Sequence, residues 1–287
     1  MPDMLHKLKS SLSLLTEGYV SLFLFEMKRQ VWSDVTSYAL RRDLSLPFAP
    51  PPASIPITLR PFEAADGKHF GGRTGLLHRL TMTRTDRTSR AEFIKAGIPW
   101  SYVAVTEDGE PCFIQWLIAP SAGEKAEAYR KEYPPPLSDD EVIMENAFVP
   151  KRHRGKRIMA CAMAQVAEKG RETGAAWVVT NVEAWNLPSL RGCLASGFHP
   201  YVFRRITWRG FKRTCSFTWL DDAQVRQLES LWQRGFLSEN GHFERLLQRL
   251  LGRLTGPGLQ DGAKLKRFAY ALCKRQDTRR RDGRKPQ

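Results

Sequence analysis

The sequence lacks the cysteine spacing that a zinc site or a disulfide framework requires. Its five cysteines are Cys112, Cys161, Cys193, Cys215 and Cys273, and they form no C-x-x-C pair and no Cys/His ligand set. Their number is odd and they lie far apart along the 287 residues. We therefore expect free thiols, no bound metal and a reducing, cytoplasmic location.

A long apolar run is also lacking. The stretch "YVSLFLF" (19–25) is far shorter than the roughly 20 apolar residues of a membrane-spanning helix, and Glu17 and Glu26 flank it closely. It shows no small-residue cleavage site of the kind that ends a signal peptide. The sequence therefore predicts a soluble protein without a transmembrane segment.

Acidic residues are few relative to basic ones. The chain has 45 Lys and Arg against 30 Asp and Glu, which gives a net charge of +15 and a pI of about 9.9. This balance favours anionic partners such as phosphates, nucleic acid or an acidic membrane face, and it carries no information on the fold. Hydrophobic residues make up 42% of the chain, so a substantial core is expected rather than disorder.

The first 46 residues are predicted to form a helix–strand appendage. Apolar residues from Leu5 to Leu22 recur at intervals of three and four, which is typical of an amphipathic helix, and 35–44 reads as a short strand. We expect the apolar stripe to pack on the main body or on a second copy, so a homodimer stays open, as does a membrane-surface role. The proline-rich stretch 47–56 predicts a linker.

The main domain is predicted to span 57–220. Its middle reads as strand, helix and strand over 141–149, 156–173 and 176–182, which requires a parallel strand pair with a right-handed crossover. Hairpins around Asp108-Gly109 and Arg209-Gly210 add antiparallel pairs. The fold class is therefore α/β of mixed α+β type, with a mixed, mostly antiparallel central sheet and helices on both faces.

The C-terminal part is predicted to be helical and then disordered. Apolar residues recur at helical spacing in 221–276, which indicates a helical extension. The last residues, 277–287, form a basic tail that we expect to be solvated and disordered.

A basic loop, "PKRHRGKR" (150–157), lies between the first strand of the parallel pair and its helix. The first turn of a helix offers unpaired N–H groups and the positive end of the helix dipole, so it readily binds an anion. Gly155 allows close approach of a ligand to the backbone, and Arg154, Lys156 and Arg157 add positive charge. These features suit a pyrophosphate, although a solvated basic loop would have the same composition.

The segment from this loop onward resembles the coenzyme A-binding half of the GNAT acyltransferase superfamily. That family shows a hydrophobic strand, a "V-x-P-x-x-R-G-x-G-x-G/A" loop, a helix, a second strand, an "N-x-x-S/A" block and a closing "G-F". The resemblance covers roughly 57–220, and its motifs lie in 141–201. The matching residues are Val149, Arg154, Gly155, Asn186, Ser189, Gly197 and Phe198.

The resemblance implies a GNAT-like sheet with a parallel, splayed strand pair, acetyl-coenzyme A as co-substrate and no metal. It implies an N-acetyltransferase in which a primary amine attacks the thioester directly in a ternary complex. Arg157 stands where the family has glycine and Met159 where it has a small residue, so Arg157 either crowds the pyrophosphate or binds it. The expected cofactor contacts are Phe148, Val149, Arg154, Gly155, Lys156, Arg157, Ile158, Asn186 and Ser189.

Two residues are candidates for proton transfer. Glu141 and Glu145 share one face of their strand, and Glu145 is the preferred base because it is nearer the expected splay at 147–149; an ordinary surface carboxylate is the alternative. Many family members have a tyrosine seven positions after the asparagine, and here that position is Cys193. A thiol could protonate the leaving thiolate, but a buried structural cysteine is the favoured interpretation. A nucleophilic pair of Cys193 and His199 lacks a third group.

Two other functions remain open. The high charge, the basic tail and the missing glycines favour a nucleic-acid-associated protein, or a transferase of the same fold that uses aminoacyl-tRNA. No aromatic-interleaved basic motif or helix-turn-helix signature was found, so nucleic acid is the less favoured partner. A catalytically silent relative is the third reading. The acceptor, whether small amine, amino sugar, peptide N-terminus or protein lysine, is not disclosed by the sequence.

Overall fold

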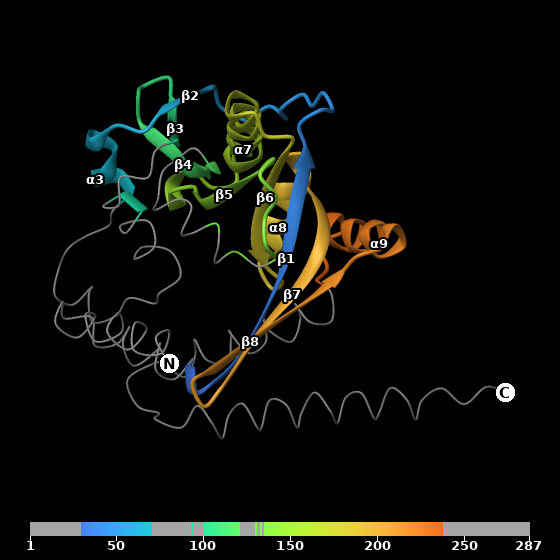
Figure 1. The fold of residues 1–287 in the computed structure, drawn as a ribbon. Coiled ribbons are helices and arrows are strands. Elements are labelled where there is room, and N and C mark those ends of the chain that lie inside the picture. Colours follow the sequence, from blue (N-terminus) through green and yellow to red (C-terminus); the bar gives the residue numbers. More distant parts are fainter. Residues whose placement is uncertain are drawn as a thin grey trace, which may run out of the picture.

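A computed structural model describes residues 30–70, 93–94, 100–120, 130, 133 and 135–237 (Figure 1). In this part of the chain, eight strands form one sheet in the order β2-β3-β4-β5-β6-β1-β7-β8. The strands are β1 (Trp32–Asp43), β2 (Ile57–Pro61), β3 (Ser101–Thr106), β4 (Pro111–Ile118), β5 (Glu141–Phe148), β6 (Trp177–Glu183), β7 (His199–Arg209) and β8 (Lys212–Trp219).

The helices pack on the two faces of this sheet. They are α3 (Gly67–Phe70), α7 (Ile158–Lys169), α8 (Leu187–Ala195) and α9 (Asp222–Gln233), with short 3-10 turns at Ala64–Asp66, Lys151–His153 and Gly170–Thr173. Alternate residues of each strand enter two separate apolar clusters. Val142 and Met144 pack with α7 and α8, while Ile143, between them, packs with Phe70 of α3 on the other face.

The predicted fold class is confirmed. The sheet is mixed, and β5 and β6 form the parallel pair, joined by α7 as the crossover. The other strand pairs of the described sheet, including the predicted hairpins β3–β4 and β7–β8, are antiparallel. Helix α7 begins at Ile158 and ends at Lys169, which is shorter than predicted because 170–173 continues as a 3-10 turn; Gly174 then takes the left-handed conformation expected at a helix end.

The position of β1 corrects the predicted appendage. Residues 1–46 were expected to form a peripheral unit, but β1 lies inside the sheet, antiparallel to β6 on one side and β7 on the other. Its Leu40 is fully buried. Buried Arg42 holds β1 to the helices, since it donates to the backbone oxygens of Ala164 and Ser196 and pairs with Glu168. The N-terminal strand therefore belongs to the core of the main domain.

The linker after β1 crosses the helical face of the sheet. Its backbone N–H at Ser54 donates to the carbonyl oxygen of Lys156 at 2.9 Å, which ties the linker to the basic loop. Its Phe48 packs against the motif glycine Gly197, where an added Cβ would lie 2.7 Å from the ring. Gly197 has φ +83°, so both the close approach and the backbone conformation account for glycine here.

Several predictions concern residues outside the described part of the chain. These are the amphipathic helix over 5–22, residues 238–276 of the C-terminal extension and the basic tail 277–287. Of the extension, α9 lies in the described residues, with Trp232 fully buried against Tyr38 of β1.

Candidate functional site

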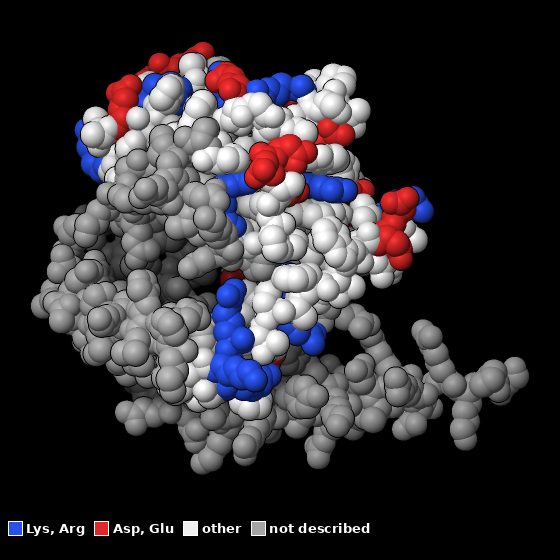
Figure 2. All heavy atoms as spheres, viewed as in Figure 1, with Lys and Arg blue, Asp and Glu red and all other residues white. Residues whose placement is uncertain are grey.

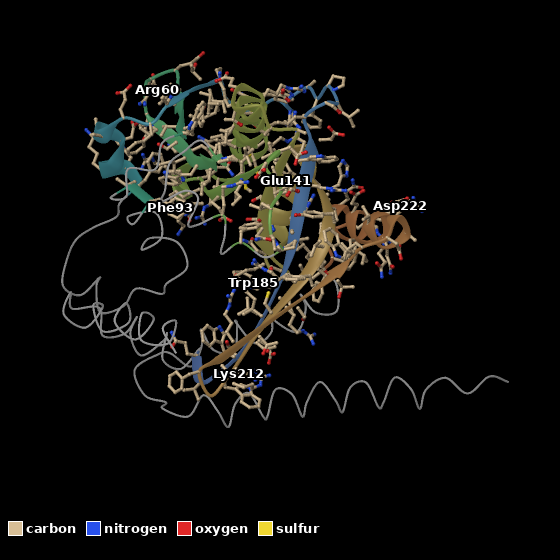
Figure 3. All side chains as sticks on the ribbon, viewed as in Figure 1. Arg60, Phe93, Glu141, Trp185, Lys212 and Asp222 are labelled. Carbon is tan, nitrogen blue, oxygen red and sulfur yellow. The ribbon has the colours of Figure 1, made fainter. Side chains whose placement is uncertain are left out.

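The parallel strands β5 and β6 are paired over only three residues. β5 and β6 pair through Glu141–Trp177, Val142–Val178 and Ile143–Val179, and no pairing between them continues beyond. Both strands go on past this point, β5 to Phe148 and β6 to Glu183. In Figure 3, Glu141 marks the paired end of β5, and Trp185, just beyond β6, marks the open end. The structure thus contains a diverging strand pair whose backbone groups are not used by each other.

A β-bulge lies in β5 on the open side. Phe148 pairs with Ile114 of β4, whereas Glu145 pairs with Trp116, so β5 has one more residue than β4 over this stretch. Asn146 lies in the bulge with φ +57°, which is an uncommon conformation for a residue other than glycine. The bulge re-aims the strand beyond Glu145 and leads it into the basic loop.

Glu145 and Asn181 lie on the same face of the open pair. Each is two residues past the last paired position, Ile143 and Val179, and side chains two apart on a strand share a face. Glu145 is half-buried and opposite Trp116. The Oδ1 atom of Asn181 is buried and has no hydrogen-bond partner within the described residues. Sequence reasoning missed Asn181 because only the register of β5 and β6 puts it on the same face as the predicted base.

The basic loop has two left-handed residues before α7. Gly155 has φ +81° and Arg157 has φ +57°, and a Cβ on Gly155 would meet nothing within 4 Å. Arg157 is the N-cap of α7 and no side chain caps the helix. The carbonyl oxygen of Arg157 accepts a hydrogen bond from the N–H of Cys161 at 3.2 Å, which is the first backbone hydrogen bond of the helix. The N-cap side chain thus accepts no hydrogen bond from the first turn, as the anion-binding prediction requires.

The side chains of the basic loop differ in how exposed they are to a ligand. Arg154 folds back, donating from Nε to the carbonyl oxygen of Val149 at 3.1 Å, and its guanidinium lies 5.9 Å from the Phe148 ring. Arg157 is exposed, Lys156 is half-buried and Ile158 is buried in the core. The loop therefore brings together most of the predicted cofactor contacts, from Phe148 to Ile158, at the start of one helix.

An ion-pair cluster fixes the first half of the loop. Glu110, in the β3–β4 turn, pairs with Arg152 and lies 3.2 Å from Nε2 of His153. His153 is only 5% exposed. These contacts hold the loop to the neighbouring hairpin.

Asn186 and Ser189 form a hydrogen bond with each other at the start of α8. Asn186 is the N-cap of α8, and its side-chain oxygen accepts a hydrogen bond from the N–H of Ser189 at 3.3 Å. This bond explains the Asn-x-x-Ser spacing by helix capping alone. Direct contact of Asn186 and Ser189 with a cofactor remains a prediction.

Cys193 lies in the core. It is 1% exposed and its Sγ is 4.0 Å from Sδ of Met163 on α7. Burial raises the pKa of the Cys193 thiol to about 12. His199 is instead exposed and 2.6 Å from Glu229. This placement favours the structural interpretation of Cys193 and does not bring it together with His199.

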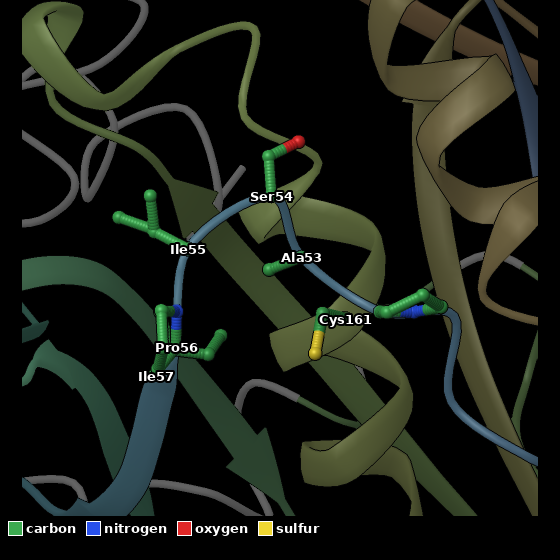
Figure 4. Close-up of a pocket in the computed structure, with 7 residues that line it drawn as sticks. Ala53, Ser54, Ile55, Pro56, Ile57 and Cys161 are labelled. Atoms are coloured by element: carbon green, nitrogen blue, oxygen red, sulfur yellow. The ribbon is translucent and has the colours of Figure 1, made fainter.

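A pocket of about 320 Å³ lies between the linker and α7 (Figure 4). Linker residues 52–57 and Cys161 line it, and its walls are mostly apolar. None of the predicted site residues lines this pocket. We find no group of three or more His, Cys, Asp or Glu side chains suited to a metal among the described residues, and no described helix is long and apolar enough to span a membrane.

Of three comparisons with known proteins, only the search of solved structures gives matches. Neither a scan of protein-family models nor a search of curated proteins gives a match. Solved structures with a similar fold include a glucosamine N-acetyltransferase region of a fungal multi-domain β-N-acetylglucosaminidase, with TM-score 0.42 and 14% identity over 64% of this chain and 22% of that one. A GNAT-family acetyltransferase from Colwellia psychrerythraea gives 0.39 and 12%, over 61% and 56% of the two chains.

A third similar structure is an N-acetyltransferase from Sphaerobacter thermophilus, with TM-score 0.37, 18% identity and coverage of 65% of this chain and 56% of that one. The match thus spans less than two thirds of the length of each of these three neighbours. All three TM-scores are below 0.5.

Proposed function

We propose that the protein is an acyl-coenzyme A-dependent N-acetyltransferase of GNAT type. The observation that carries this proposal is the position of the basic loop: it follows the strand that has just separated from β6, and it ends in an uncapped helix. A diphosphate at the helix start would leave the rest of an extended ligand free to run between the diverging strands.

The residues of the loop fit a diphosphate. The N–H groups of the first turn of α7 and the helix dipole favour negative charge there. Gly155 leaves open space over its backbone, and exposed Arg157 can reach the same corner. Arg157 has the left-handed backbone conformation that glycine adopts easily. Its backbone can therefore take the place of the family's glycine and leave the start of α7 open to a ligand.

The chemistry needs three contributions. Bound acetyl-coenzyme A supplies an activated acyl carbonyl, which the amine nitrogen attacks while the C–S bond breaks. Glu145 accepts the proton that the attacking amine loses, directly or through a water molecule. Backbone N–H groups on the open edges of the strands donate to the oxyanion, since β5 and β6 do not pair with each other there. Protonated Glu145 then returns this proton to the leaving thiolate, directly or through a water molecule.

Thermal denaturation with acetyl-coenzyme A and longer acyl forms tests the proposal, followed by a panel of amines with detection of released coenzyme A. A ligand that binds only the folded state adds about 2.7 kcal/mol of stability at a hundredfold excess over its dissociation constant. A rise in melting temperature and amine-dependent coenzyme A release are expected. No shift with any acyl form would contradict the proposal, and a shift without release from any amine would favour a catalytically silent relative.

A further inference from the structure

The strands β1, β7 and β8 extend together away from the rest of the sheet and end in a common tip (Figure 1). Trp32 pairs with Arg209, and Arg209 pairs with Lys212 across the hairpin turn. The N–H of Gly210 donates to the carbonyl oxygen of Val31 at 2.8 Å. We call Val31, Trp32 and 209–213 the arm tip; Figure 3 labels Lys212 there.

The arm tip exposes apolar side chains at its outer end. Val31 is 47% exposed, Trp32 56% and Phe211 42%. Three of the seven exposed large apolar residues in the described part of the chain lie at this tip. A monomeric protein rarely gathers such residues on one projection unless they contact a partner.

The turn at the tip holds Phe211 in an unfavourable conformation. Gly210 and Phe211 have φ +54° and +67°, and the second of these positions usually carries glycine, asparagine or aspartate. An aromatic residue gains nothing from the left-handed region, and Phe211 is not compensated by burial. Its ring at this position therefore points to a role at the surface.

Cations lie directly behind the apolar residues. Residues 199–220 include five Lys and Arg and no Asp or Glu. Arg209 stacks on Trp32 at 3.9 Å and pairs with Asp34 at 2.7 Å, while Lys212 and Arg213 are exposed. Figure 2 shows Lys and Arg side chains gathered at this end of the molecule.

We propose that the arm tip docks on the surface of a membrane that contains anionic lipids. The order of side chains decides between this partner and nucleic acid. At a lipid surface, apolar and aromatic groups enter the boundary of the acyl region and Lys and Arg remain at the headgroups, which is the order along the strand from Phe211 in the turn back to Lys212 and Arg213. On a nucleic acid the cations would have to be outermost to reach phosphates.

Vesicle flotation with the full chain tests this inference. We expect the protein to float with phosphatidylcholine vesicles that contain phosphatidylserine and not with phosphatidylcholine alone. Lys212→Glu/Arg213→Glu is expected to weaken binding at least about tenfold, because each cation near an anionic surface contributes roughly fivefold to affinity. The matched control is Arg191→Glu/Arg226→Glu, which makes the same charge change at exposed sites on α8 and α9 and is expected to bind like the wild type.

A second variant separates binding from folding. Phe211→Asn removes the ring and puts a residue that tolerates φ +67° at the turn, so its melting temperature is expected to equal or exceed that of the wild type while vesicle binding falls. Absence of wild-type binding, or unchanged binding by both arm variants, would overturn the inference. So would arm-dependent binding of a labelled oligo(dT) together with vesicle binding that does not depend on the arm.

Discussion

Ile143 of β5 and Val179 of β6 are the last residues that join the two strands, and the residues of the proposed active site lie beyond them. Beyond Ile143, β5 leads through its bulge at Asn146 to the basic loop and the start of α7. Beyond Val179, β6 brings Asn181 to the face that carries Glu145. One change in pairing therefore separates a closed, apolar sheet from an open corner with a carboxylate, unused backbone groups and a helix N-terminus.

Substitution of Gly155 tests the proposed diphosphate-binding site. Gly155→Asp is expected to abolish the thermal shift with acetyl-coenzyme A, because it places a negative charge against the phosphates. The matched control is Gly155→Asn, which has nearly the same size and tolerates the left-handed conformation at φ +81°. We expect the Asn variant to retain a clear shift; equal, unchanged shifts in both variants would locate the diphosphate elsewhere.

Removal of the Glu145 carboxylate tests the proposed base. Glu145→Gln is expected to lower kcat by about 100-fold to 10,000-fold, the range that general base catalysis contributes. The thermal shift with acetyl-coenzyme A should persist, because Glu145 is not part of the loop. Glu141→Gln, at the paired end of the same strand, is the control and should keep most of the activity. A kcat within a few-fold of the wild type in Glu145→Gln would exclude Glu145 as the base.

Substitution of Cys193 separates its catalytic and structural interpretations. Because the thiol is buried and its pKa is raised to about 12, we expect Cys193→Ala to lower the free energy of unfolding by about 1–2 kcal/mol and to leave kcat within about twofold. Cys193→Ser should be at least as destabilising, since it buries a hydroxyl among apolar groups. A fall of about 100-fold in kcat in a variant that remains folded would instead support proton donation by Cys193.

The Arg60–Asp66 ion pair should make stability depend on pH. Two hydrogen bonds of 2.7 Å join their side chains, and Asp66 is 3% exposed. Burial acts to raise the pKa of Asp66, but hydrogen bonds from Arg60 and from the N–H of Glu63 outweigh it, so the pKa in the folded state is below its ordinary value. The stabilisation is thus present above the unfolded pKa of about 3.9 and is lost as the pH falls through the folded pKa.

Denaturant titrations at neutral and acidic pH check this expectation. Asp66→Asn should cost about 2 kcal/mol at neutral pH and reduce the loss of stability on acidification. Glu63→Gln, whose side chain is 66% exposed and 3.5 Å from Arg60, should cost less than about 1 kcal/mol. Equal effects of the two substitutions would show that the buried pair contributes no more than the exposed one.

The strand–helix–strand unit and the basic loop could be predicted because their signals are local. β-rich runs, an apolar helix face and the glycine and asparagine of the two motif blocks lie within about sixty residues, and each depends on neighbours in the sequence. These elements are present in the structure. The motif residue Asn186 caps α8, and Gly197 allows the ring of Phe48 to approach the backbone closely.

Long-range pairing decided what the sequence alone could not. A strand carries no mark of its partners, so β1 was placed at the periphery, although its register with β6 and β7 puts it inside the sheet. The same holds for the end of pairing at Ile143 and Val179 and for the position of Asn181. The sequence determined which segments become strands and helices and where positive charge gathers; the contacts between distant segments decided which residues meet at the open corner, because those contacts depend on packing across the whole sheet.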